Sequence, residues 1–420
     1  MNYLFLHHNF PAQFRYTAAA LAGRPENTVV FLTEHRRGDV KLPGVRQGIV
    51  PVPQPKSTDN QAEYDTLLVL RRGESFGNAM LDLRRQGFTP DIVVDHCGWG
   101  CGLFVKDVFP RARRTGYFEW YFNKRYPQDL SRGDPERLPA LFAPQRLRNQ
   151  CQLDALAECD VAICPTEWQK SQYPELFQPK IQVLHDGIDP NFFTPAISAV
   201  PGRNACADAQ AGEGDALLQE MPNSGLFGEK ELVTYTARGF EPTRGFPEFF
   251  RSLPTVLAAR PDCHVLIVGE DRTVYDGLRP DKRTWLQAML AETPVDEGRV
   301  HILGFQAYPR YKKLLQSSSV HVYLTAPYVL SWSMLEAMSC GCLVLGADTP
   351  PVREVLRHGV NGFLTPFPDV PALAAGIIEL LEKRDQLEDV RRAARQTVLD
   401  GYNVHALLPR QLQLLHGHPL

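Results

Sequence analysis

"VHVYLTAPYVLSWSMLEAMSCGCLVLGAD", residues 320–348, contains two short apolar runs separated by a polar loop and a helical pattern. Apolar strands on either side of a helix are typical of a βαβ unit, in which the strands run parallel and are buried on both faces. We expect the helix to begin at Ser331 or Ser333. Ser333 and Glu336 also have the spacing of a capping box, so Glu336 is either a cap partner or a ligand-binding group.

The same alternation continues on both sides of this unit. Upstream, "ELVTYTARGF", "HVLIVGED" and "RVHILGF" are apolar runs separated by helical patterns, and "NYLFL", "NTVVFLT", "DIVVDH", "GYF" and "DVAIC" form a similar series in the first half of the chain. Two series of this kind predict an α/β protein with two doubly wound, Rossmann-like domains. Their parallel sheets are expected to face each other across a cleft, with functional residues at strand ends.

A stretch rich in Gly, Pro, Asp and Asn separates the two series. Such a composition without sustained periodicity is typical of a linker or an irregular insertion. We therefore expect an N-terminal domain at 1–190, an insertion at 191–228, a C-terminal domain at 229–400 and a C-terminal segment at 401–420 that returns to the first domain.

Composition limits the classes of function. The chain has 420 residues, 44% of them hydrophobic, and a net charge of −3, which argues against nucleic acid as the main partner. Its nine cysteines are an odd number and fit a reducing cytoplasm better than a disulfide framework. Basic clusters at 111–114 and 123–125 leave open a contact with the inner face of a membrane, against the alternative of a solvated surface.

Two arginines follow the strand "ELVTYTARG". Arg238 ends the strand, and Arg244 lies six residues later at the start of a helical pattern. Guanidinium groups near a helix N-terminus form an anion site, for which a diphosphate is the natural ligand. The alternative is that Arg238 pairs with Glu241 and Arg244 is exposed.

Strand ends in the first half also carry polar side chains. His96 ends "DIVVDH", and Glu119 follows the "GYF" run, where it is either an acceptor-binding group or a structural carboxylate. The loop "HHNFPAQFR" lacks glycine and offers Asn9, Gln13 and Arg15 as ligand contacts, whereas its phenylalanines are expected to pack in the core.

The run "LSWSMLEAMSCGCLVLGADTPPVREVLRHGVNGFL" resembles the donor-binding signature of retaining glycosyltransferases of family 4, which have the GT-B fold. "RGFEPTRG" resembles the R-x-x-E-P-x-K-G stretch of that family, and "HDGID" its interdomain linker. "HHNFPAQFR", "DHCGWG", "GYFEWYF" and "PTEWQ" are similar to the N-terminal half of a bacterial subgroup.

The resemblance implies roles for individual residues. Arg238 and Arg244 hold the donor diphosphate, Glu336 binds the nucleotide ribose, and His96 lies beside the reacting sugar. The remaining donor-binding positions are Ser331, Trp332, Ser333, Met334, Tyr328, Glu241 and Gly304. Tyr328 stands where the family has a sugar-binding Glu, so this chain departs from the pattern there.

The expected activity is a metal-independent transfer of a sugar from a nucleotide-sugar donor, UDP- or GDP-linked, to an acceptor hydroxyl with retention of configuration. No cofactor is implied. The acceptor is a glycan, a lipid-linked glycan, a protein or a small molecule, and the location is the cytoplasm or the inner face of the membrane. Alternatives are a nucleotide-sugar epimerase of the same fold and a catalytically weak nucleotide-sugar-binding partner subunit.

Overall fold

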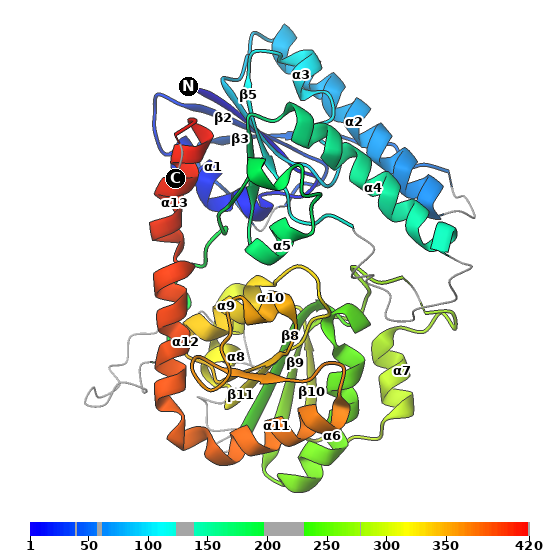
Figure 1. Ribbon diagram of the computed structural model, residues 1–420, viewed down its shortest axis with the longest axis vertical. Helices are drawn as coiled ribbons and strands as arrows, with labels where there is room; N and C mark the ends of the chain where they lie inside the picture. Colours follow the sequence, from blue (N-terminus) through cyan, green and yellow to red (C-terminus); the bar gives the residue numbers. More distant parts are fainter. Residues whose placement is uncertain (38–39, 57–60, 123–137, 197–230, 278, 419–420) are drawn as a thin grey trace, which may run out of the picture. The chain divides into compact units, whose positions relative to one another are not determined.

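The computed structural model describes residues 1–37, 40–56, 61–122, 138–196, 231–277 and 279–418. The chain divides into two compact units (Figure 1). The first contains the described residues of Met1–Gly187 together with those of Val404–Leu420, and the second contains those of Ile188–Asn403. Most of the predicted insertion at 191–228 lies outside the described residues.

The first unit is built on a seven-stranded sheet in the order β3-β2-β1-β4-β5-β6-β7. Every pair of neighbouring strands is parallel. Its strands are β1 (Asn2–Leu6), β2 (Thr28–Thr33), β3 (Val45–Ile49), β4 (Ile92–His96), β5 (Arg113–Tyr117), β6 (Val161–Cys164) and β7 (Ile181–Val183). Its helices are α1 (Arg15–Ala22), α2 (Gln61–Arg85), α3 (Val105–Val108), α4 (Leu138–Glu158), α5 (Glu167–Ser171) and α13 (Val404–Leu415).

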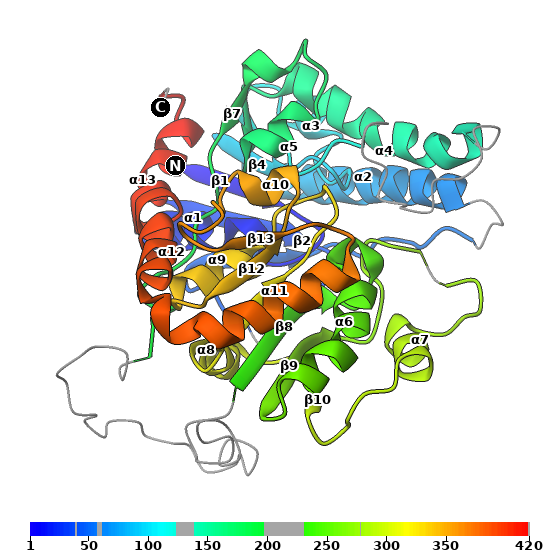
Figure 2. The ribbon, with the colours of Figure 1, turned by 60° about the horizontal axis from the view of Figure 1, so that its bottom comes forward.

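Long helices cover this sheet. Helices α2 and α4 pack side by side, and α13 packs against α1 although the two are far apart in sequence (Figures 1 and 2). The described residues therefore place the last helix of the chain in the first unit. Its leucines Leu407, Leu414 and Leu415 join the core formed around Phe5 and Phe31.

The second unit is built on a six-stranded parallel sheet in the order β10-β9-β8-β11-β12-β13. The strands are β8 (Glu231–Gly239), β9 (Cys263–Glu270), β10 (Val300–Gly304), β11 (Val320–Tyr323), β12 (Val344–Ala347) and β13 (Phe363–Thr365). The helices are α6 (Phe246–Ala259), α7 (Trp285–Glu292), α8 (Tyr308–Gln316), α9 (Trp332–Ser339), α10 (Pro350–Arg353), α11 (Val370–Lys383) and α12 (Glu388–Gly401). The prediction of two doubly wound parallel sheets is thus confirmed.

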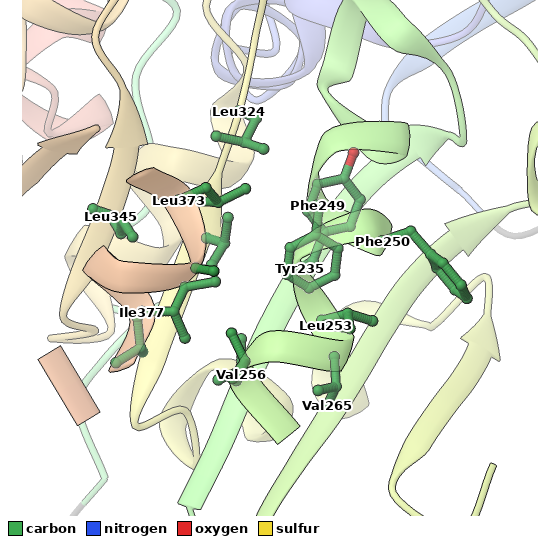
Figure 3. Close-up of a cluster of buried hydrophobic side chains, with 14 of the residues drawn as sticks. Tyr235, Phe249, Phe250, Leu253, Val256, Val265, Leu324, Leu345, Leu373 and Ile377 are labelled. Carbon is green, nitrogen blue, oxygen red and sulfur yellow. The ribbon is translucent and has the colours of Figure 1, made fainter. Parts of the chain in front are cut away.

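Helices α6 and α11 pack on one face of the second sheet and close its main core (Figure 3). Phe249 of α6 lies over Tyr235 of β8, with the two rings stacked 4.6 Å apart, and Phe250 belongs to the same cluster. The aromatic and aliphatic side chains of this cluster are almost fully buried. Burial of this kind contributes roughly 2 kcal/mol for each large side chain, so the core fixes the strand ends that it supports.

An ion pair stabilises the first sheet from within. Arg114 of β5 donates to both carboxylate oxygens of Asp95 on β4, at 3.2 and 3.1 Å, and both side chains are buried. Arg114 Nη1 also donates to Glu158 at 2.7 Å. The prediction that the basic cluster at 111–114 lies on the surface is therefore wrong at Arg114, because Asp95 holds its guanidinium inside the protein. The cluster at 123–125 lies outside the described residues.

Gly102 leaves the space that this ion pair needs. A Cβ atom there would lie 2.0 Å from Asp95 Oδ2 and 3.0 Å from Arg114 Nη2. We predict that Gly102→Ala lowers the free energy of unfolding by about 3 kcal/mol, because it separates a buried ion pair. Denaturant unfolding followed by circular dichroism measures the change.

Gly277→Ala is the matched control, since a Cβ atom at this exposed site meets nothing within 4 Å. We expect it to change stability by less than about 0.5 kcal/mol. Equal unfolding midpoints for the two variants would contradict the role given to Gly102.

Candidate functional site

Arg244 is a buried and anchored cation just beyond the end of β8. It closes a short 3₁₀ turn after β8, and the core residue Tyr235 donates a hydrogen bond to its carbonyl at 2.7 Å. Its side chain is only 6% exposed, and Nη1 donates to Thr325 Oγ1 at 3.1 Å and to the Val329 carbonyl at 2.9 Å. The guanidinium is thus anchored to the loop that leads into α9.

Two tyrosine rings lie beside this guanidinium. Its Cζ atom is 5.1 Å from the Tyr275 ring centroid and 5.7 Å from that of Tyr328, and the two rings are 5.1 Å apart. Cation–π contacts of this kind offset part of the cost of burying a charge. Within the described parts of the chain, however, no carboxylate forms an ion pair with Arg244. A buried cation without a counter-ion is well suited to bind an anion.

Arg238 lies at the end of β8 and is exposed. The alternative in which it pairs with Glu241 is wrong. Glu241 is fully buried, and its Oε2 accepts hydrogen bonds from the backbone amides of Val274, Tyr275 and Asp276 at 2.8, 2.8 and 3.0 Å. Its carboxylate therefore faces another loop of the protein.

A second set of bonds reinforces this link between loops. Asp276 accepts from the Thr243 amide at 2.7 Å and from the Thr243 hydroxyl at 2.6 Å. Together with the bonds to Glu241, these contacts hold the segment that carries Tyr275 against the turn that carries Arg244. Glu241 and Asp276 thus help to hold the side chains of Tyr275 and Arg244 next to each other.

Helix α9 begins as one of the two sequence alternatives predicts. Ser331 is its N-cap, and the Ser331 hydroxyl accepts from the Ser333 amide at 3.3 Å. The Ser331 amide donates to the Tyr323 hydroxyl at 2.8 Å, which ties the cap to β11. Ser333 therefore does not begin a capping box, and Glu336 lies in the second turn of the helix.

Glu336 is 6% exposed, an unusual environment for a carboxylate. Burial raises the pKa of Glu336 to about 7, and the hydroxyl of Tyr311 opposes that rise. A buried carboxylate with a raised pKa, near the start of a helix, is a candidate for binding a ligand hydroxyl.

The other residues predicted for this site differ in their surroundings. Met334 is fully buried in the core, so its side chain packs against the protein, whereas Trp332 is half-buried. Gly304 ends β10 with a positive φ of +66°, and a Cβ atom there would meet nothing within 4 Å. Phe305 follows it and is 72% exposed. This strand end is thus open to a flat ligand.

The first unit brings His96, Glu119 and Gln13 together at its strand ends. His96 Nε2 lies 3.5 Å from Glu119 Oε2, and Gln13 Nε2 donates to Glu119 Oε1 at 2.8 Å. The Glu119 carbonyl accepts from Gln169 Nε2 at 2.6 Å. Glu119 is thus held from two sides and keeps its carboxylate partly exposed.

The remaining residues of the loop after β1 contact neighbouring side chains or pack in the core. Asn9 contacts the two preceding histidines, through its amide to His7 Nδ1 at 2.8 Å and through its side chain to His8 Nε2 at 2.7 Å. Arg15 is exposed beside the ring of Tyr16. Phe10 and Phe14 are buried in the core, as predicted.

Sequence reasoning missed several residues of both sites. Tyr275 and Thr325 contact Arg244, and His7 contacts His96 with ring centroids 4.9 Å apart. The adjacent pair of histidines at the end of the first strand is the signal that could have found His7. Tyr275 has no such signal, because its segment is held beside Arg244 by long-range bonds to Glu241 and Thr243.

Two further properties concern metals and membranes. Across the described residues, no group of three or more His, Cys, Asp or Glu side chains is arranged to hold a metal ion. The cysteines of these residues are free thiols, all of them buried. None of the described helices combines the length and apolar character needed to span a bilayer.

Comparison with known sequences identifies both halves of the chain. Residues 25–193 match the family described as Glycosyl transferase family 4 group, and residues 219–397 match Glycosyl transferases group 1. The chain belongs to the GT-B glycosyltransferases of family 4. The recognition made from the sequence motifs is thereby confirmed.

Curated relatives of the family match over part of their length. Phosphatidyl-myo-inositol mannosyltransferase of Mycolicibacterium smegmatis is 31% identical over 175 residues, which are 41% of this chain and 40% of that protein. N-acetyl-alpha-D-glucosaminyl L-malate synthase of Bacillus anthracis is 30% identical over 141 residues, 34% of each chain. The matches thus span about 40% or less of these two relatives.

Solved structures of the same fold match over almost the whole chain. Sucrose-phosphate synthase from Thermosynechococcus elongatus has a TM-score of 0.72 at 16% identity, covering 99% of this chain and 98% of that one. The Anabaena protein HepE, solved with UDP and glucose, has a TM-score of 0.66 at 16% identity, covering 99% of both chains. At such identities the likeness is one of fold.

The raised pKa of Glu336 predicts a stability gain on substitution. The folded protein holds this proton more tightly than the unfolded chain, whose Glu pKa is about 4.3, so ionisation costs stability as the pH rises toward 7. We predict that Glu336→Gln raises the free energy of unfolding by up to about 3 kcal/mol at pH 8, and by progressively less as the pH falls toward 4.5.

Denaturant unfolding at pH 5, 6, 7 and 8 measures this dependence. Glu379→Gln is a suitable control, because Glu379 is exposed and pairs with Lys383 on the same helix. A gain for Glu336→Gln that is equal at all four pH values would show that Glu336 does not titrate in this range.

Proposed function

We propose that this protein transfers a sugar from a nucleotide-sugar donor to an acceptor hydroxyl, with retention of the anomeric configuration. The observation that carries the proposal is the buried, anchored guanidinium of Arg244, which has no carboxylate partner among the described residues. A diphosphate supplies the missing negative charge. Membership of a glycosyltransferase family supports a sugar as the group attached to it.

The donor residues belong to the second unit. In this proposal Arg244 and the exposed Arg238 bind the diphosphate, and the first turn of α9 adds backbone amides. Glu336 accepts hydrogen bonds from the ribose hydroxyls. In this proposal the open strand end at Gly304 binds the base of the nucleotide. The structural neighbour HepE was solved with UDP, which supports uracil as that base; guanine, in a GDP-linked donor, is the alternative.

The reaction breaks the bond between the anomeric carbon and the diphosphate oxygen and forms a bond from that carbon to the acceptor oxygen. Negative charge builds on the leaving diphosphate, and Arg244 stabilises it without reorganising, because its position is already fixed. We propose that the acceptor proton passes to a leaving phosphate oxygen on the same face of the sugar. Asp95 is not available as a covalent nucleophile, since Arg114 holds both of its oxygens.

The first unit supplies the groups beside the reacting sugar in this proposal. His96 and Glu119 lie at strand ends and are held by Gly98 and Gln13. We propose that His96 contacts a hydroxyl of the transferred sugar and that Glu119 contacts the acceptor. The buried thiols fit a reducing compartment, so we place the protein in the cytoplasm.

Thermal-shift measurements with UDP, GDP and their sugar conjugates test the donor site. A ligand that binds only the folded protein raises its melting temperature, and we expect a rise with one nucleotide series. Arg238→Ala and Arg244→Ala should each weaken the response by at least about tenfold in affinity, because each removes a charge-assisted contact to phosphate. Glu336→Gln should weaken it while leaving the protein more stable.

Arg251→Ala is the control, since Arg251 is a half-exposed arginine of the same unit that pairs with Glu292. Arg244→Lys, which keeps the charge, guards against loss of folding in the alanine variant. If nucleotide raises the melting temperature of both Arg238→Ala and Arg244→Ala as much as that of the unmodified protein, the assignment of the donor site is wrong. NMR of the product linkage checks whether the anomeric configuration is retained. Isomerisation of the donor in the absence of an acceptor would indicate an epimerase. Nucleotide-sugar binding without turnover would indicate a catalytically weak partner subunit.

A further inference from the structure

A group of buried polar atoms in the first unit has no hydrogen-bond partner among the described residues. They are His7 Nε2 after β1, His96 Nε2 at the end of β4, and Gln13 Oε1 on the loop that follows β1. His7 is 3% exposed and His96 is 2% exposed. His96 Nε2 lies 3.5 Å from Glu119 Oε2, which is long for a hydrogen bond. A buried polar atom without a partner costs about 1–3 kcal/mol, so the group indicates a place for a polar ligand.

The protonation of His7 is fixed by its surroundings. Its Nδ1 accepts from the Asn9 amide at 2.8 Å, so the ring carries its proton on Nε2. Burial, together with the neighbouring imidazoles of His96 and His8, lowers the pKa of His7 well below its usual value. His7 therefore offers a neutral N–H donor at physiological pH.

Acceptor atoms lie next to these donors. Gln13 donates to Glu119 Oε1 through Nε2, which leaves its carbonyl oxygen to accept, and Glu119 Oε2 lies 3.5 Å from His96 Nε2. A hydroxyl group both donates and accepts, so a pair of hydroxyls satisfies such a mixture better than a carboxylate or an ammonium group. Anions are disfavoured, since Glu119 is acidic and Arg72 is already paired with Glu34.

An aromatic surface adjoins the same group of atoms. Trp99 is 39% exposed, and its ring lies 4.2 Å from that of His8 and 6.1 Å from that of His96. Its carbonyl accepts from Arg72 Nη1 at 2.9 Å, and Arg72 is fixed in turn by its ion pair. The main chain of Trp99 is thus fixed, and its indole is a half-exposed apolar surface beside hydroxyl-binding groups. This combination fits the C–H face and the hydroxyl edge of a sugar ring.

We propose that the acceptor is a carbohydrate whose ring packs on Trp99 while its hydroxyls bond to His7, Gln13 and Glu119. This inference rests on the proposed function, because it names the acceptor class for the same reaction. It makes His7 and Trp99 specificity-determining residues and leaves the donor groups of the second unit unchanged.

Direct binding without a donor tests the proposal separately from transfer. Saturation-transfer difference NMR is performed with a panel of methyl hexopyranosides, and with L-malate and myo-inositol 1-phosphate as anionic probes. We expect at least one glycoside to bind at millimolar concentration and neither anion to compete with it. UDP binding, measured in parallel, reports on the donor site, so failure of one assignment is distinguished from failure of the other.

His7 permits a matched pair of variants. In His7→Asn the side-chain oxygen replaces Nδ1 and keeps the bond from Asn9, but the Nε2 donor is lost. In His7→Gln the amide nitrogen replaces Nε2 and keeps the donor. We expect His7→Asn to weaken glycoside binding about tenfold and His7→Gln to weaken it less than about threefold.

Trp99 and an exposed leucine complete the test. Trp99→Ala should weaken glycoside binding about tenfold or more, Trp99→Phe less than about threefold, and Leu176→Ala, at a residue 83% exposed, not at all. Thermal unfolding of each variant verifies that it is folded. The proposal is overturned if no glycoside binds, if an anionic probe competes, or if folded His7→Asn and Trp99→Ala bind a glycoside as the unmodified protein does.

Discussion

Parallel pairing of every strand is the constraint on which this structure depends. Parallel strands need long crossover connections, so helices cover the sheets and each strand ends at the same edge as its neighbours. The loops gather at that edge, and in the second unit the residues of the candidate site follow or end separate strands. Arg244 follows β8, Thr325 and Ser331 follow β11, and Gly304 ends β10.

In the second unit, the hydrophobic core helps to position the candidate site. Tyr235 packs its ring on Phe249 and uses its hydroxyl to hold the Arg244 carbonyl. Glu241 and Asp276 then fix the neighbouring loop through backbone amides and a threonine. The position of one guanidinium is therefore set by apolar packing and by carboxylates that do not touch it, which makes the site rigid without placing a negative charge against its cation.

Strand and helix patterns predicted the fold class, because continuous apolar runs between amphipathic helices have few other solutions. Short-range signals also predicted the start of α9 at Ser331, although spacing could not separate it from Ser333. The pattern overlooked β3, whose residues are only half-buried, and the largely polar α2. The sequence pattern also could not predict long-range pairing. Arg114 was interpreted as a surface charge, because no residue close to it in sequence indicates its ion pair with Asp95. The proposed roles of the site residues remain predictions.

The buried thiols have a practical consequence for anyone who wishes to watch this protein at work. Burial raises the pKa of Cys97, Cys101 and Cys342, and all eight cysteines of the described residues are shielded from solvent. Thiolate is the reactive form, so these side chains are poor targets for alkylating reagents. Once Cys206, outside the described residues, is replaced, a cysteine introduced at an exposed position becomes the preferred site for attaching a single fluorophore.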